Sequence, residues 1–391
     1  MSKVDNIVDK PTPTSAVWSI PTLRVGMAGL AGAVAVVWFV FYLATDGVFL
    51  TDRNLVNLFR QTATTGIVAI GMLVVIAQGE IDLSVGSLLG LVATVVAMTE
   101  SATGGSLVVS LPVAIGVGIA CGMWNGFWVS FLGVPSFVVT LGGLMIFRGL
   151  SLVLSEGRTI AGIGAGIRFL GEGYLTGIAM FSVLAIGLAF AILPLLRLRD
   201  AAPKRRALYV WRTLMLVSAL IALVWATMSY RGLPVPVAIA LLLAGCIATV
   251  LDNTPWGRHV YAVGASRSAS RIAGINIRMH LIGSFVLVAV ICSVAAVLVA
   301  GRLGSVPPDA GQFLELNAIA AVVIGGASLY GGTGRVGGAV LGALLTQSLL
   351  NGFSLMNIPT AYQYGASGLV LMIAVFVDVL SKRGRHVFVR L

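Results

Sequence analysis

Long apolar segments recur along almost the whole chain, and only short polar stretches separate them. An α-helix needs about 20 apolar residues to cross a bilayer, and twelve segments approach that length: 25–45, 58–78, 85–103, 107–132, 136–155, 175–196, 209–229, 233–251, 281–302, 314–330, 334–353 and 362–380. Segment 136–155 contains Arg148 and segment 314–330 is short, so ten to twelve spanning helices are expected. Only 10% of the residues are charged, compared with about 25% in soluble proteins. The sequence therefore predicts an all-α polytopic membrane protein with a single transmembrane domain over 25–380.

Basic residues gather in a few of the predicted loops. If the N-terminus is cytoplasmic, strict alternation places the clusters at 197–206, 258–278 and 382–390 on the same cytoplasmic side, as the positive-inside rule requires. Residues 1–24 and 381–391 are then cytoplasmic tails. The net charge of +11 is explained by this topology, so the predicted contact is with the lipid bilayer and no nucleic-acid partner is expected.

Two glycine-containing breaks, near 79–87 and 330–335, interrupt the apolar pattern on the predicted cytoplasmic side. Aligned at an offset of 248, residues 74–92 and 322–340 share six identities in nineteen positions. This similarity is either a weak internal repeat or the chance self-similarity of glycine-rich sequence. Paired helix breaks in corresponding halves indicate a translocation site in many transporters. The candidate gate or hinge residues are Glu80, Asp82, Ser84, Gly86, Gly331, Gly332 and Gly334.

The first break carries two acidic residues, which are costly next to hydrocarbon. Asp82 and Ser84 immediately precede a helix that should begin near Val85, where their side chains could cap free backbone N–H groups. Capping does not explain Glu80. A role in gating or in contact with a sugar is the alternative for that residue.

The predicted cytoplasmic loop 252–280 is basic and contains a short amphipathic pattern. Ala269, Ile272 and Ala273 have helical i, i+3, i+4 spacing, and Gly274 is a natural C-terminal stop. A short helix of this kind could dock into a groove on a soluble partner. Alternatively, a basic loop could lie on anionic lipid headgroups.

Few residues could carry out chemistry. The four lysines precede Val, Pro, Arg and Arg, so the chain lacks the Gly-Lys-Ser/Thr sequence of a phosphate-binding loop. The histidines and cysteines show no ligand spacing. We therefore expect no enzymatic activity, no cofactor and no metal site in this chain.

Polar side chains within or beside the spans could line a path for a neutral polyol, or could simply form interhelical hydrogen bonds. The candidates are Gln61, Asn125, Thr140, Asn317, Asn351 and Gln363.

Several motifs together resemble the membrane permease subunits of bacterial ABC importers for simple sugars, the ribose- and xylose-type permeases. The resemblance covers about 45–380 and is strongest to the xylose type. The motifs that carry it are Asn57–Thr62, Gly79–Ser87, Val134–Leu141, Gly257–Gly264, Ser270–Asn276 and Ala318–Gly326. The stretch 197–236 looks like the extra segment of xylose-type members. One departure is Asn317, where the family commonly has aspartate.

The resemblance implies a multi-pass protein of the bacterial inner membrane that forms a homodimer. It would work with an ATP-binding cassette subunit and a periplasmic sugar-binding protein. The loop 252–280 would contact the ATPase, and the predicted coupling residues are Gly257, Arg258, Tyr261, Gly264, Arg271, Ile272, Gly274 and Asn276.

The function expected from these observations is import of a neutral monosaccharide, D-xylose above others, by alternating access driven by the partner ATPase. Another small solute is the first alternative: ribose, a different sugar or a branched-chain amino acid. An amino acid would require charged groups facing the pathway. A stand-alone ion-coupled carrier would require a titratable residue in mid-span, for which Arg148, Glu315 and Asp378 are the candidates. A passive channel would conduct without a binding protein.

Overall fold

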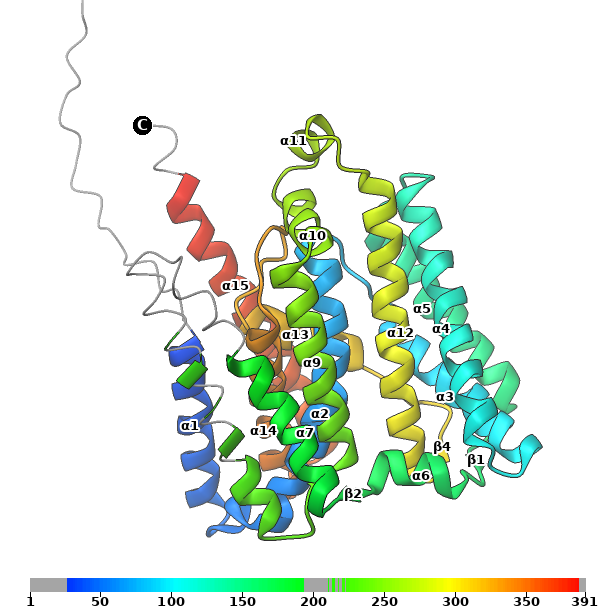
Figure 1. The fold of residues 1–391 in the computed structure, drawn as a ribbon, viewed down its shortest axis with the longest axis vertical. Coiled ribbons are helices and arrows are strands. Elements are labelled where there is room, and N and C mark those ends of the chain that lie inside the picture. The colour runs from blue at the N-terminus through cyan, green and yellow to red at the C-terminus, as the bar shows by residue number, and fades with distance from the viewer. Residues whose placement is uncertain are drawn as a thin grey trace, which may run out of the picture.

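The computed structural model describes residues 27–192, 210, 213–214, 217, 220–221 and 223–386, and it is helical almost throughout (Figure 1). The predicted tail 1–24 and the last five residues of the predicted tail 381–391 lie outside the described residues.

Eight described helices are long and apolar enough to cross a membrane: α1 (Met27–Ala44), α2 (Asp52–Ala77), α3 (Val85–Thr103), α4 (Leu107–Ser130), α5 (Ser136–Ser155), α9 (Val235–Asn253), α12 (Ile277–Leu303) and α14 (Val336–Leu355). Further apolar helices are α7 (Gly177–Ile192), α13 (Leu314–Ile324) and α15 (Thr360–His386). These helices correspond to eleven of the twelve predicted segments. The remaining segment, 209–229, lies only partly within the described residues. The prediction of an all-α polytopic membrane protein is therefore confirmed.

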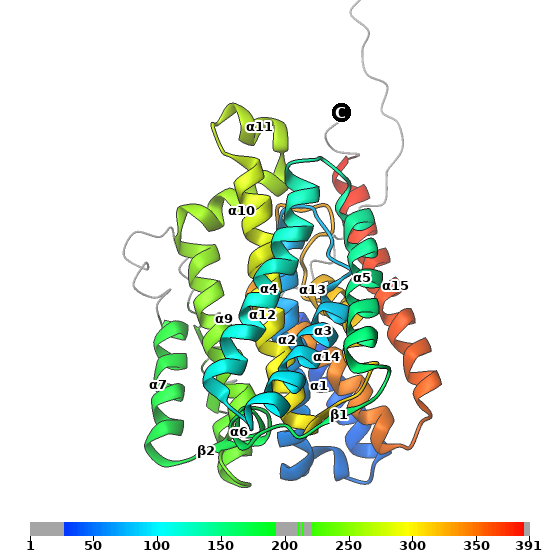
Figure 2. The ribbon, with the colours of Figure 1, turned by 90° about the vertical axis from the view of Figure 1, so that its right-hand side faces the viewer.

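Short elements occupy the two ends of the bundle (Figures 1 and 2). At one end, α10 (Pro255–Ala265) lies beside the ends of the long helices, and α11 (Arg267–Ile272) protrudes beyond them. This is the predicted cytoplasmic end, and we call it the α10–α11 end. The opposite end, the α6 end, carries α6 (Ala165–Glu172) and four two-residue strands, whereas η1 (Val48–Leu50) connects α1 to α2. In antiparallel pairs, β1 (Ile160–Ala161) joins β4 (Ser305–Val306), and β2 (Tyr174–Leu175) joins β3 (Leu233–Pro234).

Helices α2, α3 and α12 form the centre of the bundle. In α2, 83% of the apolar window is buried, compared with 17% in α1 and 22% in α4 and α5, which lie at the periphery. Helix α4 packs against α12 through small residues: a Cβ atom at Gly122 would lie 2.7 Å from the Phe285 carbonyl oxygen, and one at Gly126 2.8 Å from Ile282 Cγ1. Such close backbone approach is the usual basis of helix association in lipid.

Two links interrupt the bundle at the predicted breaks. Residues 78–84 join α2 to α3, and residues 325–335 join α13 to α14. The start of α3 at Val85 is as predicted, and the Asp82 carboxylate accepts from the backbone N–H of Ser84, but the predicted capping by Ser84 is wrong. The Ser84 side chain makes no capping hydrogen bond to α3. Its hydroxyl instead donates to Asp82 Oδ1 at 2.6 Å, and the same oxygen accepts from the Ser84 N–H at 2.8 Å.

Candidate functional site at the junction of the two links

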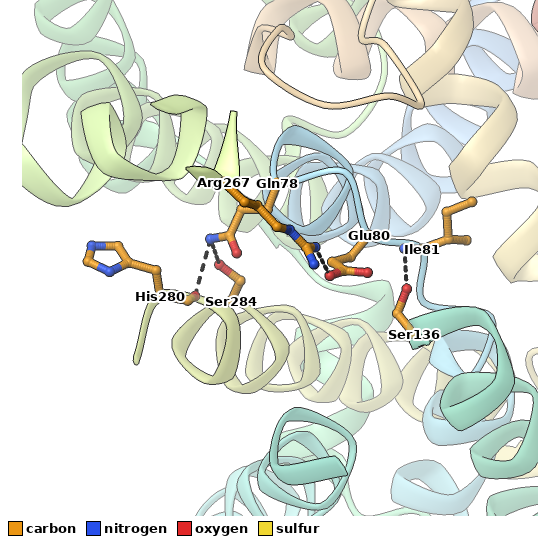
Figure 3. Close-up of polar contacts among 7 residues, drawn as sticks. All are labelled: Gln78, Glu80, Ile81, Ser136, Arg267, His280 and Ser284. Atoms are coloured by element: carbon orange, nitrogen blue, oxygen red, sulfur yellow. Dashed lines mark hydrogen bonds and ion pairs between the residues drawn. The ribbon is translucent and has the colours of Figure 1, made fainter. Parts of the chain in front are cut away.

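The link 78–84 is held between α12 and α5 (Figure 3). Gln78 Nε2 donates to the His280 carbonyl oxygen at 3.2 Å and to Ser284 Oγ at 2.6 Å, both on α12. On the other side, the Ile81 N–H donates to Ser136 Oγ at 3.3 Å, at the first residue of α5. The link is therefore a fixed connection between these two helices.

Glu80 forms an ion pair with Arg267, the first residue of α11 (Figure 3). The Glu80 side chain is 9% exposed and the Arg267 side chain is 50% exposed. The arginine compensates a carboxylate that would otherwise be buried without a counter-ion. Sequence reasoning missed Arg267, because the only signal was an unexplained acid in one segment and a basic residue in another, 187 positions away.

Two candidate pathway residues lie against the same link. Asn125 Nδ2, from α4, donates to Ser84 Oγ at 2.9 Å. Thr140 Oγ1, from α5, is 3.2 Å from the Ile81 carbonyl oxygen and 2.8 Å from that of Ser136. Both side chains are almost completely buried. Asn125 thus connects α4 to the link, and Thr140 connects α5 to it.

Helix α10 contacts Ala77, the last residue of α2 before link 78–84, and also link 325–335. The Gly332 N–H donates to the Ala77 carbonyl oxygen at 2.9 Å. Gly264 lies over that hydrogen bond: an added Cβ atom would overlap the Ala77 oxygen and lie 2.6 Å from Gly332 N. The Tyr261 hydroxyl donates to the Gly334 carbonyl oxygen at 3.0 Å. We call this meeting point of α10, link 78–84 and link 325–335 the junction.

A third glycine completes the backbone contact at the junction. A Cβ atom at Gly331 would lie 2.8 Å from Gly79 N and 2.9 Å from the Gly264 oxygen. By contrast, Gly86 lies inside α3 and packs against the start of α13, where an added Cβ atom would lie 2.5 Å from the Gly311 oxygen. Of the predicted hinge glycines, Gly331, Gly332 and Gly334 therefore lie in the junction, and Gly86 does not.

A cavity of about 650 Å³ opens beside the junction. It is lined by residues 78–81, 133–137 and 263–267, together with Val129 and Tyr330. The cavity lies between α10 and the start of α5, and the Glu80–Arg267 ion pair forms part of its wall.

The predicted coupling residues divide into an inner and an outer set. Gly257, like Tyr261 and Gly264, packs inward: a Cβ atom there would lie 2.5 Å from Leu251 Cα. Arg258 and Arg271 are exposed, and Ile272 is 89% exposed. An exposed isoleucine between arginines, on a helix that protrudes from the bundle, is a surface suited to a protein partner.

A turn connects this surface to α12. Gly274 has a φ of +79°, which ends α11 as predicted, and the Asn276 side chain accepts from the Met279 N–H at the start of α12 at 3.3 Å.

The remaining pathway candidates do not converge on one site. Asn351 exchanges two hydrogen bonds with Asn54, at 2.9 and 3.1 Å. Gln363 Nε2 donates to the Ile358 carbonyl oxygen at 2.8 Å. Asn317 lines a water-sized cavity of about 10 Å³, and Gln61 is half-buried on α2.

Two contacting links interrupt the series of spanning helices, and an exposed helix pair lies next to these links. This arrangement is typical of a polytopic membrane transport subunit. The chain belongs to the family described as branched-chain amino acid transport system / permease component, which matches residues 54–375.

Three relatives are similar over most of their length. The xylose transport system permease protein XylH of Escherichia coli (strain K12) is 38% identical over 379 residues, which cover 95% of this chain and 96% of the relative. XylH of Haemophilus influenzae is 40% identical over 361 residues, covering 90% and 95%. The ribose import permease protein RbsC of Bacillus subtilis is 34% identical over 333 residues, covering 84% and 86%. No solved structure matches the chain.

The family and the spanning helices together make the chain a multi-pass protein of the bacterial inner membrane. The relatives are permease proteins rather than enzymes, in agreement with the prediction that this chain is not itself an enzyme.

Proposed function

We propose that the chain is the membrane permease subunit of an ABC importer, with D-xylose as its substrate. The observation that carries the proposal is the identity of 38–40% to xylose permeases over 90% or more of the chain. The ribose permeases are 31–34% identical over 84% of it. Xylose is therefore favoured over ribose as the transported sugar.

The mechanism is alternating access between two copies of the chain. The ATP-binding subunit binds the exposed surface of α10 and α11, around Arg258, Arg271 and Ile272. ATP-driven movement of this helix pair then reaches both links, because Gly264 contacts Ala77 and Gly332, and Arg267 holds Glu80. A periplasmic sugar-binding protein delivers xylose to the α6 end.

A branched-chain amino acid is the second candidate substrate, since the family description names that class. Its carboxylate and ammonium groups would need charged partners along the pathway. Of the candidate charged side chains, Arg148 is already bonded to the Pro308 and Ala310 carbonyl oxygens, at 3.3 and 3.0 Å. Glu315 is buried, and its Oε2 has no hydrogen-bond partner among the described residues. A neutral sugar requires no charged partners, and the higher identity to the xylose permeases favours it.

Uptake in the native host tests the proposal. Deletion of the gene should abolish high-affinity uptake of labelled xylose and leave uptake of ribose and leucine intact, and a plasmid copy should restore it. The ATP-binding subunit should co-purify with the tagged chain. Normal xylose uptake in the deletion strain, or loss of leucine uptake instead, would contradict the proposed function.

A further inference from the structure

A buried carboxylate lies at the far end of α3. Glu100 is 1% exposed, and both of its oxygens accept hydrogen bonds. Ser110 Oγ donates to Oε1, and the Gly164 N–H donates to Oε2 at 3.0 Å. An ionisable side chain within a span is costly and commonly has a function. The mechanism above gives Glu100 none.

Glu100 holds a segment that covers the α6 end of the bundle. This α6 segment, residues 156–176, includes β1, α6 and β2 (Figure 2). Its strands pair with β4 and β3. Its helix rests on the end of α12, where a Cβ atom at Gly171 would lie 2.7 Å from the Leu298 carbonyl oxygen. The bond from Gly164 to Glu100 adds an anchor on α3, and Ser110 extends that anchor to α4.

The backbone of the α6 segment approaches α3 closely at the contact with Glu100. A Cβ atom at Gly164 would lie 2.5 Å from Glu100 Oε2 and 2.7 Å from Gly105 Cα. The start of α6 is thus in backbone contact with the turn between α3 and α4. If α3 moves, the α6 segment must either move with it or lose its hydrogen bond to the carboxylate.

Helix α3 connects this contact with the junction. It is one uninterrupted helix of 19 residues, about 28 Å long at 1.5 Å per residue. Its first residue follows the link that carries Glu80 and Asp82, and its last turn carries Glu100. Rigid, packed helices are one means by which distant sites are coupled energetically.

We infer that Glu100 is a positioning residue that couples the α6 segment to the junction through α3. The inference rests on the proposed function, in which the α6 end receives the sugar. Movement of α10 and α11 displaces the link 78–84, α3 carries the displacement across the bundle, and Glu100 transfers it to the α6 segment at Gly164. The carboxylate acts by holding the segment.

The test compares variants in the purified complex with the ATP-binding subunit, reconstituted in nanodiscs. Glu100→Leu keeps the volume but removes both acceptors. It should leave assembly and basal ATPase activity unchanged, and should reduce stimulation by the sugar-loaded binding protein by about fivefold or more, as expected for loss of an allosteric coupling. Backbone amides of residues 160–172 should exchange faster with solvent deuterium. Glu100→Gln can still accept from Gly164 and donate to Ser110, and should retain most of the stimulation.

Glu172→Leu is the matched control, because its side chain is 48% exposed on the same segment; it should behave like the wild type. Normal stimulation in Glu100→Leu would overturn the inference. So would a loss of stimulation that merely parallels losses of basal activity and thermal stability in a complex that still assembles, which would mean that Glu100 only supports folding. If Glu100→Leu does not assemble, Ser110→Ala is measured in its place, because it removes only one of the two hydrogen bonds to Glu100. Normal stimulation in Ser110→Ala would also overturn the inference. If the binding protein does not stimulate the ATPase activity of the wild-type complex, the proposed function is contradicted instead. The deuterium-exchange measurement needs no ATPase activity, so it still reports on the contact between Glu100 and Gly164.

Discussion

Arg267, the first residue of α11, donates to the carboxylate of Glu80 in the link between α2 and α3, although the two residues are 187 positions apart. The pair joins the exposed helix pair to the interior of the bundle. Since half of the Arg267 side chain is exposed, solvent screens the interaction. We therefore expect the ion pair to contribute about 1 kcal/mol or less to stability. Its loss should affect transport more than folding.

Removal of the Glu80 charge tests this relationship. Glu80→Gln and Arg267→Gln should each lower xylose uptake by about fivefold or more. Glu80→Gln should change thermal stability little, whereas Arg267→Gln leaves the buried carboxylate without its counter-ion and should lower stability as well. The charge-reversed double variant, Glu80→Arg with Arg267→Glu, should regain part of the lost transport. Unchanged uptake in Glu80→Gln would show that the pair is structural.

The junction can be tested with a single methyl group. Gly264→Ala places a Cβ atom onto the Ala77 carbonyl oxygen and 2.6 Å from Gly332 N, so α10 must move away from Ala77 and from link 325–335. We expect transport to be lost while the ATP-binding subunit still co-purifies. Gly283→Ala is the control, because the nearest atom to its new Cβ, Trp256 Nε1, is 3.8 Å away. Equal transport by the two variants would exclude a coupling role for Gly264.

Reversal of charge on the exposed helix pair tests partner binding. Arg258→Glu with Arg271→Glu should abolish co-purification of the ATP-binding subunit, because both side chains lie on the proposed contact surface. Membrane insertion should be intact, as judged by protein amount in washed membranes. Arg158→Glu with Arg168→Glu makes the same change in charge at the α6 end and should leave co-purification normal. Retention of the subunit by the first double variant would disprove this docking surface.

The amide pair between Asn54 and Asn351 is expected to serve stability rather than transport. Asn351→Leu leaves the buried Asn54 Oδ1 without its donor, although Asn54 Nδ2 still donates to the Phe49 carbonyl oxygen at 2.8 Å. The unpaired acceptor costs about 1–3 kcal/mol and should lower the unfolding temperature in detergent. The xylose concentration for half-maximal uptake should stay the same. Asn54→Leu with Asn351→Leu removes both amides and should recover most of the lost stability. A change in sugar affinity would instead return Asn351 to the pathway.

Where local chemistry sets an element, sequence reasoning was accurate. The predicted limits of α3 and α5 agree with the structure, because Pro135 precedes α5 and Gly104, with a φ of +67°, follows α3. Gly118, Gly122 and Gly126 approach α12 closely, and their four-residue spacing is a pattern that the sequence displays. Segment 314–330 was predicted too long: α13 ends at Ile324, before Gly326, which has a φ of +85°.

The candidate site was only partly accessible from the sequence. The Glu80 and glycine breaks could be recognised, since polar and glycine residues interrupt a nearly continuous apolar pattern. Their partners could not, because hydrogen bonds from Gln78 to Ser284 and from Asn125 to Ser84 depend on how helices distant in sequence pack together. The capping prediction for Ser84 failed for the same reason, since Asn125 and Asp82 engage its hydroxyl.

By itself, the sequence determined that this protein spans the membrane, the approximate positions of its helices, and, through its motifs, which transport family it resembles. The first two properties follow from the cost of placing polar groups in hydrocarbon, which each spanning segment must avoid on its own. Only the tertiary structure decided that α10 lies against Ala77 and link 325–335, that Arg267 neutralises Glu80, and that Glu100 holds the α6 segment. Each of these contacts joins segments far apart in the chain, and the close packing of small residues between helices fixes them.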